Sequence, residues 1–120
     1  MKTIDIEVLI NELKKTYINA DEIVGVQKKY VIVRTLSAGI FAGYLENKNA
    51  KEVILRQVRR LWYWDGAASL SQLAMEGVSK PEKCKFPCEV NRILLTEAIE
   101  ILDTTDRAQE SIRLVPVWKE

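Results

Sequence analysis

The chain has 120 residues, with 18 basic and 17 acidic side chains, no histidine and 48% hydrophobic residues. This length and composition predict one globular domain, residues 1–120, with a core of its own. A net charge of +1 excludes a global field for gripping duplex DNA or an anionic membrane. Nucleic acid is therefore a disfavoured partner. No apolar run is long enough to span a bilayer, and we expect a cytoplasmic protein.

Catalytic and metal-binding signals are weak. The lack of histidine removes the commonest general base and a leading metal ligand. Cys84 and Cys88 lack a second pair to complete a four-ligand site, so we interpret them as reduced structural thiols. No nucleophile is spaced with a base. We therefore predict a protein that is not an enzyme and has no catalytic residue, metal site or cofactor.

The first half of the chain changes from helical to strand patterning. Residues 3–17 carry apolar side chains at spacings of three and four, which predicts an N-terminal helix within residues 1–20. A β-rich body is expected over residues 29–120. Its first strands are residues 31–35 and 40–45, and turn residues 47–50 lead into a further strand that begins at Glu52.

Residues 56–73 are the stretch around which the chain is expected to be organised. They predict a strand running straight into a helix, with Asp65 and Gly66 at the junction and the helix over residues 67–76. Alternation along the strand would place Arg56, Arg60 and Trp62 on one face. Guanidinium groups suit phosphates and indole rings stack on bases. The competing interpretation is that these rings pack in the core at the end of a sheet.

The last third is ambiguous in its first part. Residues 90–102 fit either a helical face or alternating strands, and we predict strands because the earlier strands need partners. A short helix over residues 106–112, capped by Thr104 or Thr105, is expected next. The predicted fold class is α+β: a small antiparallel sheet or partly open barrel with an N-terminal helix and two short helices, one per side of the final strands.

Charge is segregated along the chain. Residues 51–64 hold four basic residues against one acidic, whereas residues 97–110 hold five acidic residues against one basic. Such segregation suits self-association as well as ligand binding.

Three segments carry a resemblance to a known family. They are VIVRTLSAGIFAG at residues 31–43, RRLWYWDGAASLSQLA at residues 59–74 and KCKFP at residues 83–87. Together they resemble a family of small phage and prophage proteins that looks like the first type of Thoeris anti-defence proteins. Those proteins are sponges that sequester a cyclic ADP-ribose signal without degrading it.

The resemblance implies a homodimer, possibly a higher homo-oligomer, that encloses a cyclic nucleotide signal where subunits meet, in the cytoplasm of an infected or lysogenic bacterial host. The candidate ligand-binding residues are Arg34 and Arg107 for phosphates, Phe41, Trp64 and Phe86 for stacking, and Ser37 and Asp65 as polar contacts. Arg56 and Lys83 are candidates for a second basic site that binds cyclic oligonucleotides.

An alternative stays open on the sequence alone. The same arginine and tryptophan face is compatible with an oligomeric phage interaction module, or with a module that binds single-stranded nucleic acid and has no small-molecule ligand.

Overall fold

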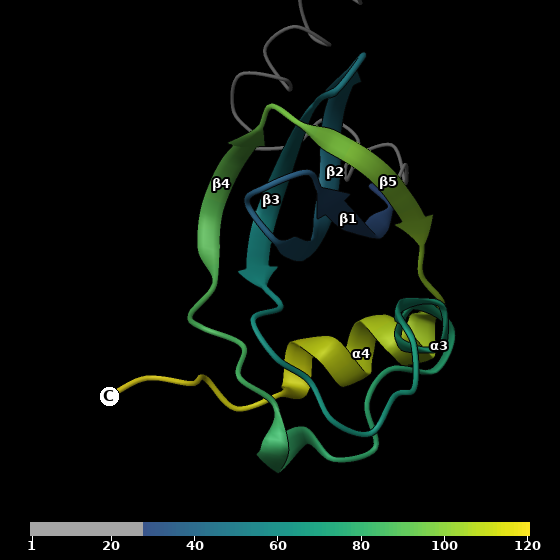
Figure 1. Ribbon diagram of the computed structural model, residues 1–120, viewed down its shortest axis with the longest axis vertical. Helices are drawn as coiled ribbons and strands as arrows, with labels where there is room; N and C mark the ends of the chain where they lie inside the picture. The colour runs from purple at the N-terminus through teal and green to yellow at the C-terminus, as the bar shows by residue number, and fades with distance from the viewer. Residues whose placement is uncertain (1–27) are drawn as a thin grey trace, which may run out of the picture.

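The computed structural model describes residues 28–120, and the predicted N-terminal helix lies outside them. Five strands form one antiparallel sheet. They are β1 (Tyr30–Thr35), β2 (Ile40–Asn49), β3 (Glu52–Arg60), β4 (Val90–Leu95) and β5 (Ala98–Asp103). Helix α3 (Leu70–Glu76) and the short 3-10 helix η1 (Pro81–Lys83) lie between β3 and β4, and α4 (Asp106–Leu114) follows β5 (Figure 1).

The sheet is strongly curled. Its strand order is β4-β3-β2-β1-β5, so β4 and β5 are the two edges. Only Thr96 and Glu97 separate these strands in the chain, and two linking residues span roughly 10 Å at most. The edges must therefore approach each other at that end. Figure 1 shows β4 and β5 meeting above the sheet and diverging below, and the backbone N–H of Ala98 also bonds to the carbonyl of Lys51 in the β2–β3 turn at 3.0 Å.

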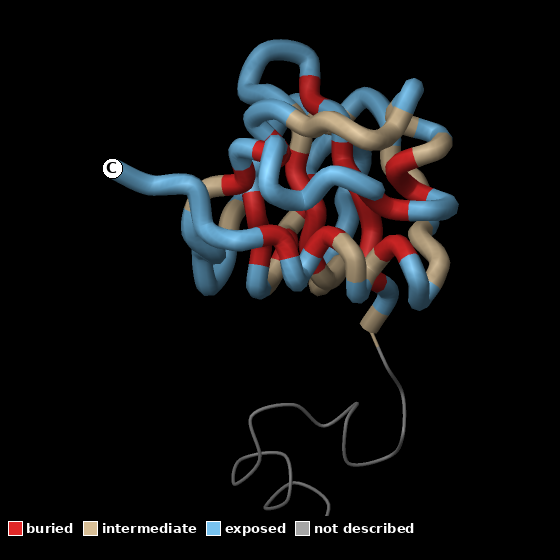
Figure 2. The backbone as a smooth tube through the Cα atoms, turned by 90° about the horizontal axis from the view of Figure 1, so that it is seen from below, coloured by how far each residue is buried: buried red, intermediate tan, exposed pale blue. Residues whose placement is uncertain are grey.

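Each face of the sheet has its own core. One, which we call the inner core, fills the curl of the sheet and consists of Val31, Val33, Phe41, Val53, Leu55, Val58 and Leu95. The other, the helix-side core, consists of Tyr30, Ile32, Ala42, Leu61, Leu73, Ala74, Val78, Cys84, Phe86, Ile112 and Val115. Successive β1 residues alternate between the two cores, which explains why β1 is a nearly continuous apolar run. Figure 2 shows the buried residues gathered in the middle of the fold.

Both helices are ended by local signals. Ser69 caps α3 by accepting a hydrogen bond from the backbone N–H of Gln72, and Gly77 terminates it at φ 77°. Thr105 caps α4 in the same way through the N–H of Ala108. The predicted end of the first helix at residue 76 and the strand interpretation of residues 90–102 are confirmed, and of the two predicted caps, Thr104 and Thr105, it is Thr105 that caps α4.

The predicted fold class is wrong. The described residues are 44% strand and 20% helix, mostly a five-stranded antiparallel sheet, and the helices come after strands: α3 after β1–β3 and α4 after β5. The physical reason is closure. Because the sheet curls over one of its own faces, short helices are needed over the other face alone.

The predicted strand over residues 56–64 is also corrected. Strand β3 ends at Arg60, and α3 begins ten residues later at Leu70. Within β3, Gln57 adopts φ 48° and the pairing with β2 shifts register between Ala42 and Tyr44. This β-bulge shifts the side-chain alternation by one residue, so Leu55 and Val58, three positions apart, both lie in the inner core, while Arg59 is buried on the other face against Phe86.

Candidate functional site: a ring and lysine surface

Arg59 is a buried side chain that links β3 to the end of α4 and to residues 86–87 through hydrogen bonds. It is 4% exposed, and its guanidinium donates four hydrogen bonds to carbonyl groups: Ile112 at 3.0 Å, Val115 at 2.7 Å, Phe86 at 2.8 Å and Pro87 at 3.3 Å. Two of these carbonyls lie at the C-terminal end of α4, where the Ile112 carbonyl also accepts a hydrogen bond from the backbone N–H of Val115 at 3.3 Å. Burial lowers the pKa of Arg59, yet a guanidinium stays charged at any ordinary pH.

Next to Arg59, three segments that are far apart in the sequence pair with one another to form a small ribbon. Tyr63 and Lys85 exchange backbone hydrogen bonds of 3.3 and 2.7 Å, and Phe86 forms a parallel bridge with Val117. The backbone N–H of Trp118 donates to the Phe86 carbonyl at 3.0 Å, the same carbonyl that Arg59 holds. The backbone carrying Tyr63, Lys85 and Trp118 is therefore fixed from two sides.

These three side chains present an open surface that we call the ring–lysine surface. The Lys85 ammonium lies 5.9 Å from the Tyr63 ring centroid and 5.6 Å from the Trp118 ring, both cation–π contacts. Tyr63 is 49% exposed and Trp118 43%. Lys85 forms no ion pair with any described residue. The surface thus offers two partly exposed rings beside one positive charge that no described carboxylate pairs with.

The predicted stacking residues Phe41 and Phe86 are corrected by their burial. Phe41 lies in the inner core, with the Arg60 guanidinium 4.7 Å above its ring. Phe86 lies in the helix-side core, with Arg59 at 5.5 Å. Each arginine covers one ring, so neither ring is available to a ligand in this structure.

Arg34 and Ser37 lie at the far end of β1. The Nε of Arg34 donates to Glu100 on β5 at 3.1 Å, and the Ser37 hydroxyl lies 3.5 Å from a carboxylate oxygen of Glu97. The predicted phosphate contact Arg34 and the predicted polar contact Ser37 are thus both already paired with acidic groups. A recess of about 290 Å³ opens nearby between β5 and the β2–β3 hairpin, and none of the predicted site residues lines it.

Trp64, Asp65 and Arg107 occupy three different environments. Trp64 packs half-buried against the helix-side core, and Asp65 lies 3.9 Å from the Lys80 ammonium. Arg107 is exposed in the first turn of α4, whereas Trp118 follows the last turn. The structure does not gather the predicted ligand-binding residues into one site within a single chain, and a site shared between subunits stays a prediction.

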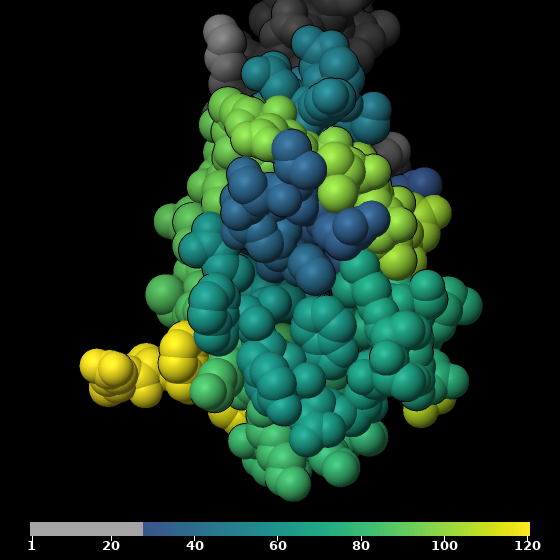
Figure 3. Space-filling view, in the orientation of Figure 1, coloured from purple at the N-terminus to yellow at the C-terminus, as the bar shows by residue number. Residues whose placement is uncertain are grey.

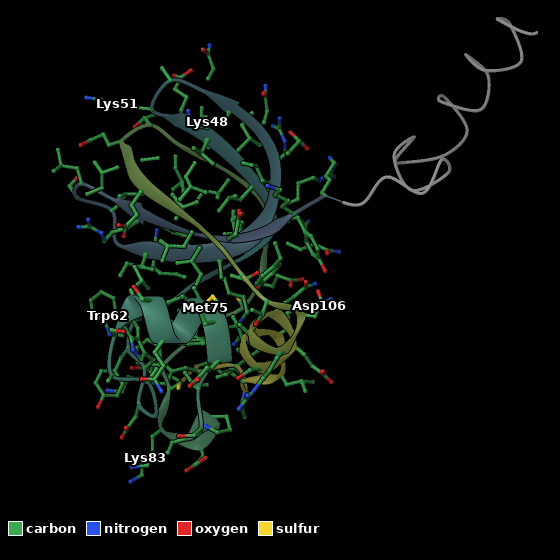
Figure 4. The ribbon with its side chains drawn as sticks, turned by 90° about the vertical axis from the view of Figure 1, so that its right-hand side faces the viewer. Lys48, Lys51, Trp62, Met75, Lys83 and Asp106 are labelled. Atoms are coloured by element: carbon green, nitrogen blue, oxygen red, sulfur yellow. The ribbon has the colours of Figure 1, made fainter. Side chains whose placement is uncertain are left out.

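The predicted second basic site is likewise divided. Lys83 is exposed on η1, at the opposite end of the molecule from the β2–β3 hairpin that Lys48 and Lys51 mark in Figure 4. Arg56 on β3 faces Arg92 on β4 in direct register. Glu46 contacts both, at 3.3 Å to Arg56 and 2.8 Å to Arg92, which lowers the pKa of Glu46 chiefly through its hydrogen bond from Arg92.

Cys84 has the burial expected of a structural thiol, whereas Cys88 does not. Cys84 is buried, and its thiol approaches the carbonyls of Asp65 at 3.6 Å and Lys80 at 3.5 Å. Burial raises its pKa, so it stays protonated and structural. Cys88 is exposed, and both thiols are free.

Sequence reasoning missed Tyr63, Lys85 and Trp118 as one surface. In Figure 3 the segment that follows β3 lies directly below the β1–β2 turn, while the C-terminal residues protrude at one side. The signal that was available is the basic loop around Lys85 next to a ring-rich strand end, but only the folded chain brings Trp118 beside them.

Fold and site together define a small strand-dominated domain with a preformed ring-and-cation surface. The family described as domain of unknown function DUF6948 matches residues 28–112, and the chain belongs to this family. No curated protein matches the chain. Within residues 28–120, no helix has the length and apolar character needed to cross a membrane.

Proposed function

We propose that this protein binds a nucleotide at the ring–lysine surface and holds it without chemical conversion. The observation that supports the proposal is the Lys85 ammonium fixed between two exposed rings on a hydrogen-bonded ribbon. A base stacks on Tyr63 or Trp118, and a phosphate takes the Lys85 charge. The lack of histidine, and of a nucleophile spaced with a base, supports capture without turnover.

Magnitudes favour a second subunit. A stacked base contributes roughly 1–3 kcal/mol and a charge-assisted hydrogen bond to phosphate roughly 1.5–3 kcal/mol. These gains are offset by an association cost of about 4 kcal/mol or more, so one open surface alone binds weakly. We therefore propose a homodimer, possibly a higher homo-oligomer, in which the partner encloses the ligand. Arg107 and Arg34 then remain candidates for phosphate contacts supplied across the interface.

The resemblance to Thoeris anti-defence proteins supplies the ligand class. We propose a cyclic ADP-ribose-type immune signal as the ligand and sequestration during phage infection as the role, in the cytoplasm of the bacterial host. The paired Arg56 and Arg92 around Glu46 support a second site for cyclic oligonucleotides, because two guanidiniums share one carboxylate and leave donors for a phosphodiester.

The test is calorimetric titration of the full chain with cyclic ADP-ribose, followed by heat release and mass spectrometry of the ligand. We expect intact ligand to be recovered. Trp118→Ala and Lys85→Met should each weaken binding at least about fivefold. Trp62→Ala, another exposed tryptophan at 65%, and Lys51→Met, another exposed lysine, are matched controls that should bind normally. A converted product, or full binding by both site variants, contradicts the proposal.

A second candidate function is favoured by the openness of the surface: a module that binds single-stranded nucleic acid or another protein, without a small ligand. A strand of bases stacks on open rings without being enclosed. Titration with a short oligonucleotide at two salt concentrations separates the candidates. Steeply salt-dependent binding that needs Trp118, with no response to cyclic ADP-ribose, would favour this alternative.

A further inference from the structure

A second cluster of polar groups lies where α4 packs under β1 and β2, on different residues from the ring–lysine surface. The Tyr44 hydroxyl accepts two hydrogen bonds, from the side-chain amide of Gln109 at 2.7 Å and from Arg113 at 3.0 Å. The Arg113 guanidinium also lies 5.8 Å from the Tyr44 ring centroid. Both lone pairs of this hydroxyl are therefore used, and its own proton is directed elsewhere.

Tyr30 adds an unpartnered hydroxyl to this cluster. Tyr30 is 5% exposed, its ring packs edge-on against the Tyr44 ring at 5.1 Å, and its backbone carbonyl accepts from Thr104 at 2.6 Å. Its hydroxyl bonds to no other described residue, although the hydroxyl oxygen itself is not sealed from solvent. A buried tyrosine usually finds a partner for its O–H, so a polar ligand at this position has a ready donor.

The charges around this hydroxyl are mainly positive. Burial raises the pKa of Tyr30, while Arg113 and then Arg59 oppose that rise; Tyr44 and Glu89 have smaller effects. Arg113 has no carboxylate within ion-pair distance among the described residues. The cluster thus presents hydroxyl and guanidinium donors beside the positive charge of Arg113, which pairs with no described carboxylate.

We propose that Tyr30, Tyr44 and Arg113 form a binding site for a small oxyanion, of which a phosphate monoester matches the donors best. Its terminal oxygens accept from the Tyr30 and Tyr44 hydroxyls and from the guanidinium N–H groups that Tyr44 leaves unused. Gln109 positions the Tyr44 hydroxyl and leaves its proton pointing to the ligand. The site does not depend on the ring–lysine surface, so it stands even if the proposed nucleotide function fails.

The experiment uses the full chain and inorganic phosphate as the probe, with calorimetry and melting temperature measured at constant ionic strength. Tyr30→Phe keeps the ring that packs in the core and removes only the hydroxyl, and Arg113→Met keeps the aliphatic stem. We expect each to weaken phosphate binding about fivefold or more. Lys48→Met removes one exposed positive charge from β2 and should bind as the unmodified chain does. An acetate arm distinguishes a carboxylate site, which would bind acetate more tightly than phosphate.

Three results would overturn the site. The first is that Tyr30→Phe and Arg113→Met bind phosphate as tightly as the unmodified chain. The second is that chloride at the same ionic strength stabilises the protein as much as phosphate does. The third is that Lys48→Met loses as much phosphate binding as the two site variants. Lys85→Met provides the separation from the nucleotide proposal. Lys85→Met should keep its phosphate affinity at the Tyr30, Tyr44 and Arg113 site while its affinity for the nucleotide falls. Arg113→Met should show weaker phosphate binding and unchanged nucleotide binding.

Discussion

Arg59 connects its own strand, β3, to two other segments through their carbonyl groups. Its four hydrogen bonds reach the end of α4, Phe86 and Pro87, all from a side chain that is almost completely buried. No carboxylate lies within ion-pair distance of it in the described residues, so these carbonyl dipoles are what compensates the buried charge. The guanidinium geometry suits this role, because five N–H groups diverge in one plane.

Replacing Arg59 should be among the most destabilising single changes in the molecule. Arg59→Met leaves the Val115 carbonyl without its donor and removes one of the two donors from the carbonyls of Ile112 and Phe86, and we expect a loss of roughly 3 kcal/mol in the free energy of unfolding. Arg59→Lys keeps a charge but has one compact donor group, so its loss should be smaller. Urea unfolding measures both. A loss under about 1 kcal/mol in Arg59→Met would show that water replaces the guanidinium readily.

Glu46 gives a pH-dependent contribution of known sign. Its pKa is lowered from 4.5 in the folded protein, mainly by the hydrogen bond from Arg92. A lowered folded pKa means that the stabilisation is present above about pH 4.5 and is lost as the pH falls through the folded pKa. Because Arg56 and Arg92 are directly opposite, the carboxylate also relieves their repulsion.

We therefore expect Glu46→Gln to be less stable than the unmodified chain by about 1 kcal/mol at pH 7, with the difference shrinking as the pH falls below 4.5. Melting curves from pH 3 to 7 test this. Glu52→Gln on β3, whose side chain makes no ion pair within the described residues, serves as the control. A constant difference across the whole pH range would exclude Glu46 ionisation as the cause.

At the scale of elements, α3 and α4 approach most tightly where Gly77 meets Ser111. Gly77 ends α3 at φ 77°, and a Cβ placed on it would lie 2.3 Å from the Cβ of Ser111 on α4. The next residue, Val78, donates its backbone N–H to the Ser111 hydroxyl at 2.9 Å. Glycine here is required both by the left-handed backbone and by the approach of α4.

Gly77→Ala should thus combine strain with a steric clash, and we expect a loss of roughly 2–3 kcal/mol by urea unfolding. Gly39→Ala is the matched control. It also replaces a glycine at positive φ, 105°, but a Cβ there meets nothing within 4 Å. Its loss should be limited to backbone strain, about 1 kcal/mol. Equal losses in the two variants would show that the Ser111 contact contributes nothing.

Local signals in the sequence are sufficient to predict where helices begin and end. They are insufficient to predict which face of the sheet a side chain occupies. Gly77 and Thr105 end and begin helices through bonds within a few residues, so the pattern predicts them correctly. The alternation through β3 failed at Gln57, because the bulge there depends on pairing with β2 and leaves no local mark. The expectation that Arg56, Arg60 and Trp62 share one face depended on that uninterrupted alternation.

At the scale of the whole molecule, closure decided both the fold and the candidate site. The sheet curls because the distant strands β1 and β5 pair, which no window of sequence reveals. The ring–lysine surface also forms through pairing between segments that are far apart in the sequence, which brings Tyr63, Lys85 and Trp118 together. The sequence could identify a ring-rich, basic segment as the region of interest, but not which of its rings are buried and which are open.

The two cores make the described part of the molecule self-sufficient. Both faces of β1 are covered by residues within 28–120, and the polar side-chain atoms buried among them all have partners. The family match begins at the same boundary, residue 28. We therefore predict that residues 28–120 produced alone fold cooperatively, with a single urea transition whose midpoint lies close to that of the full chain.

Ile32→Ala and Val33→Ala, introduced separately into this fragment, should each cost roughly 2–4 kcal/mol, because one opens a cavity in the helix-side core and the other in the inner core. If both variants shift the same single transition, the two cores unfold as one unit; a fragment that lacks a cooperative transition would show that residues 1–27 complete the fold.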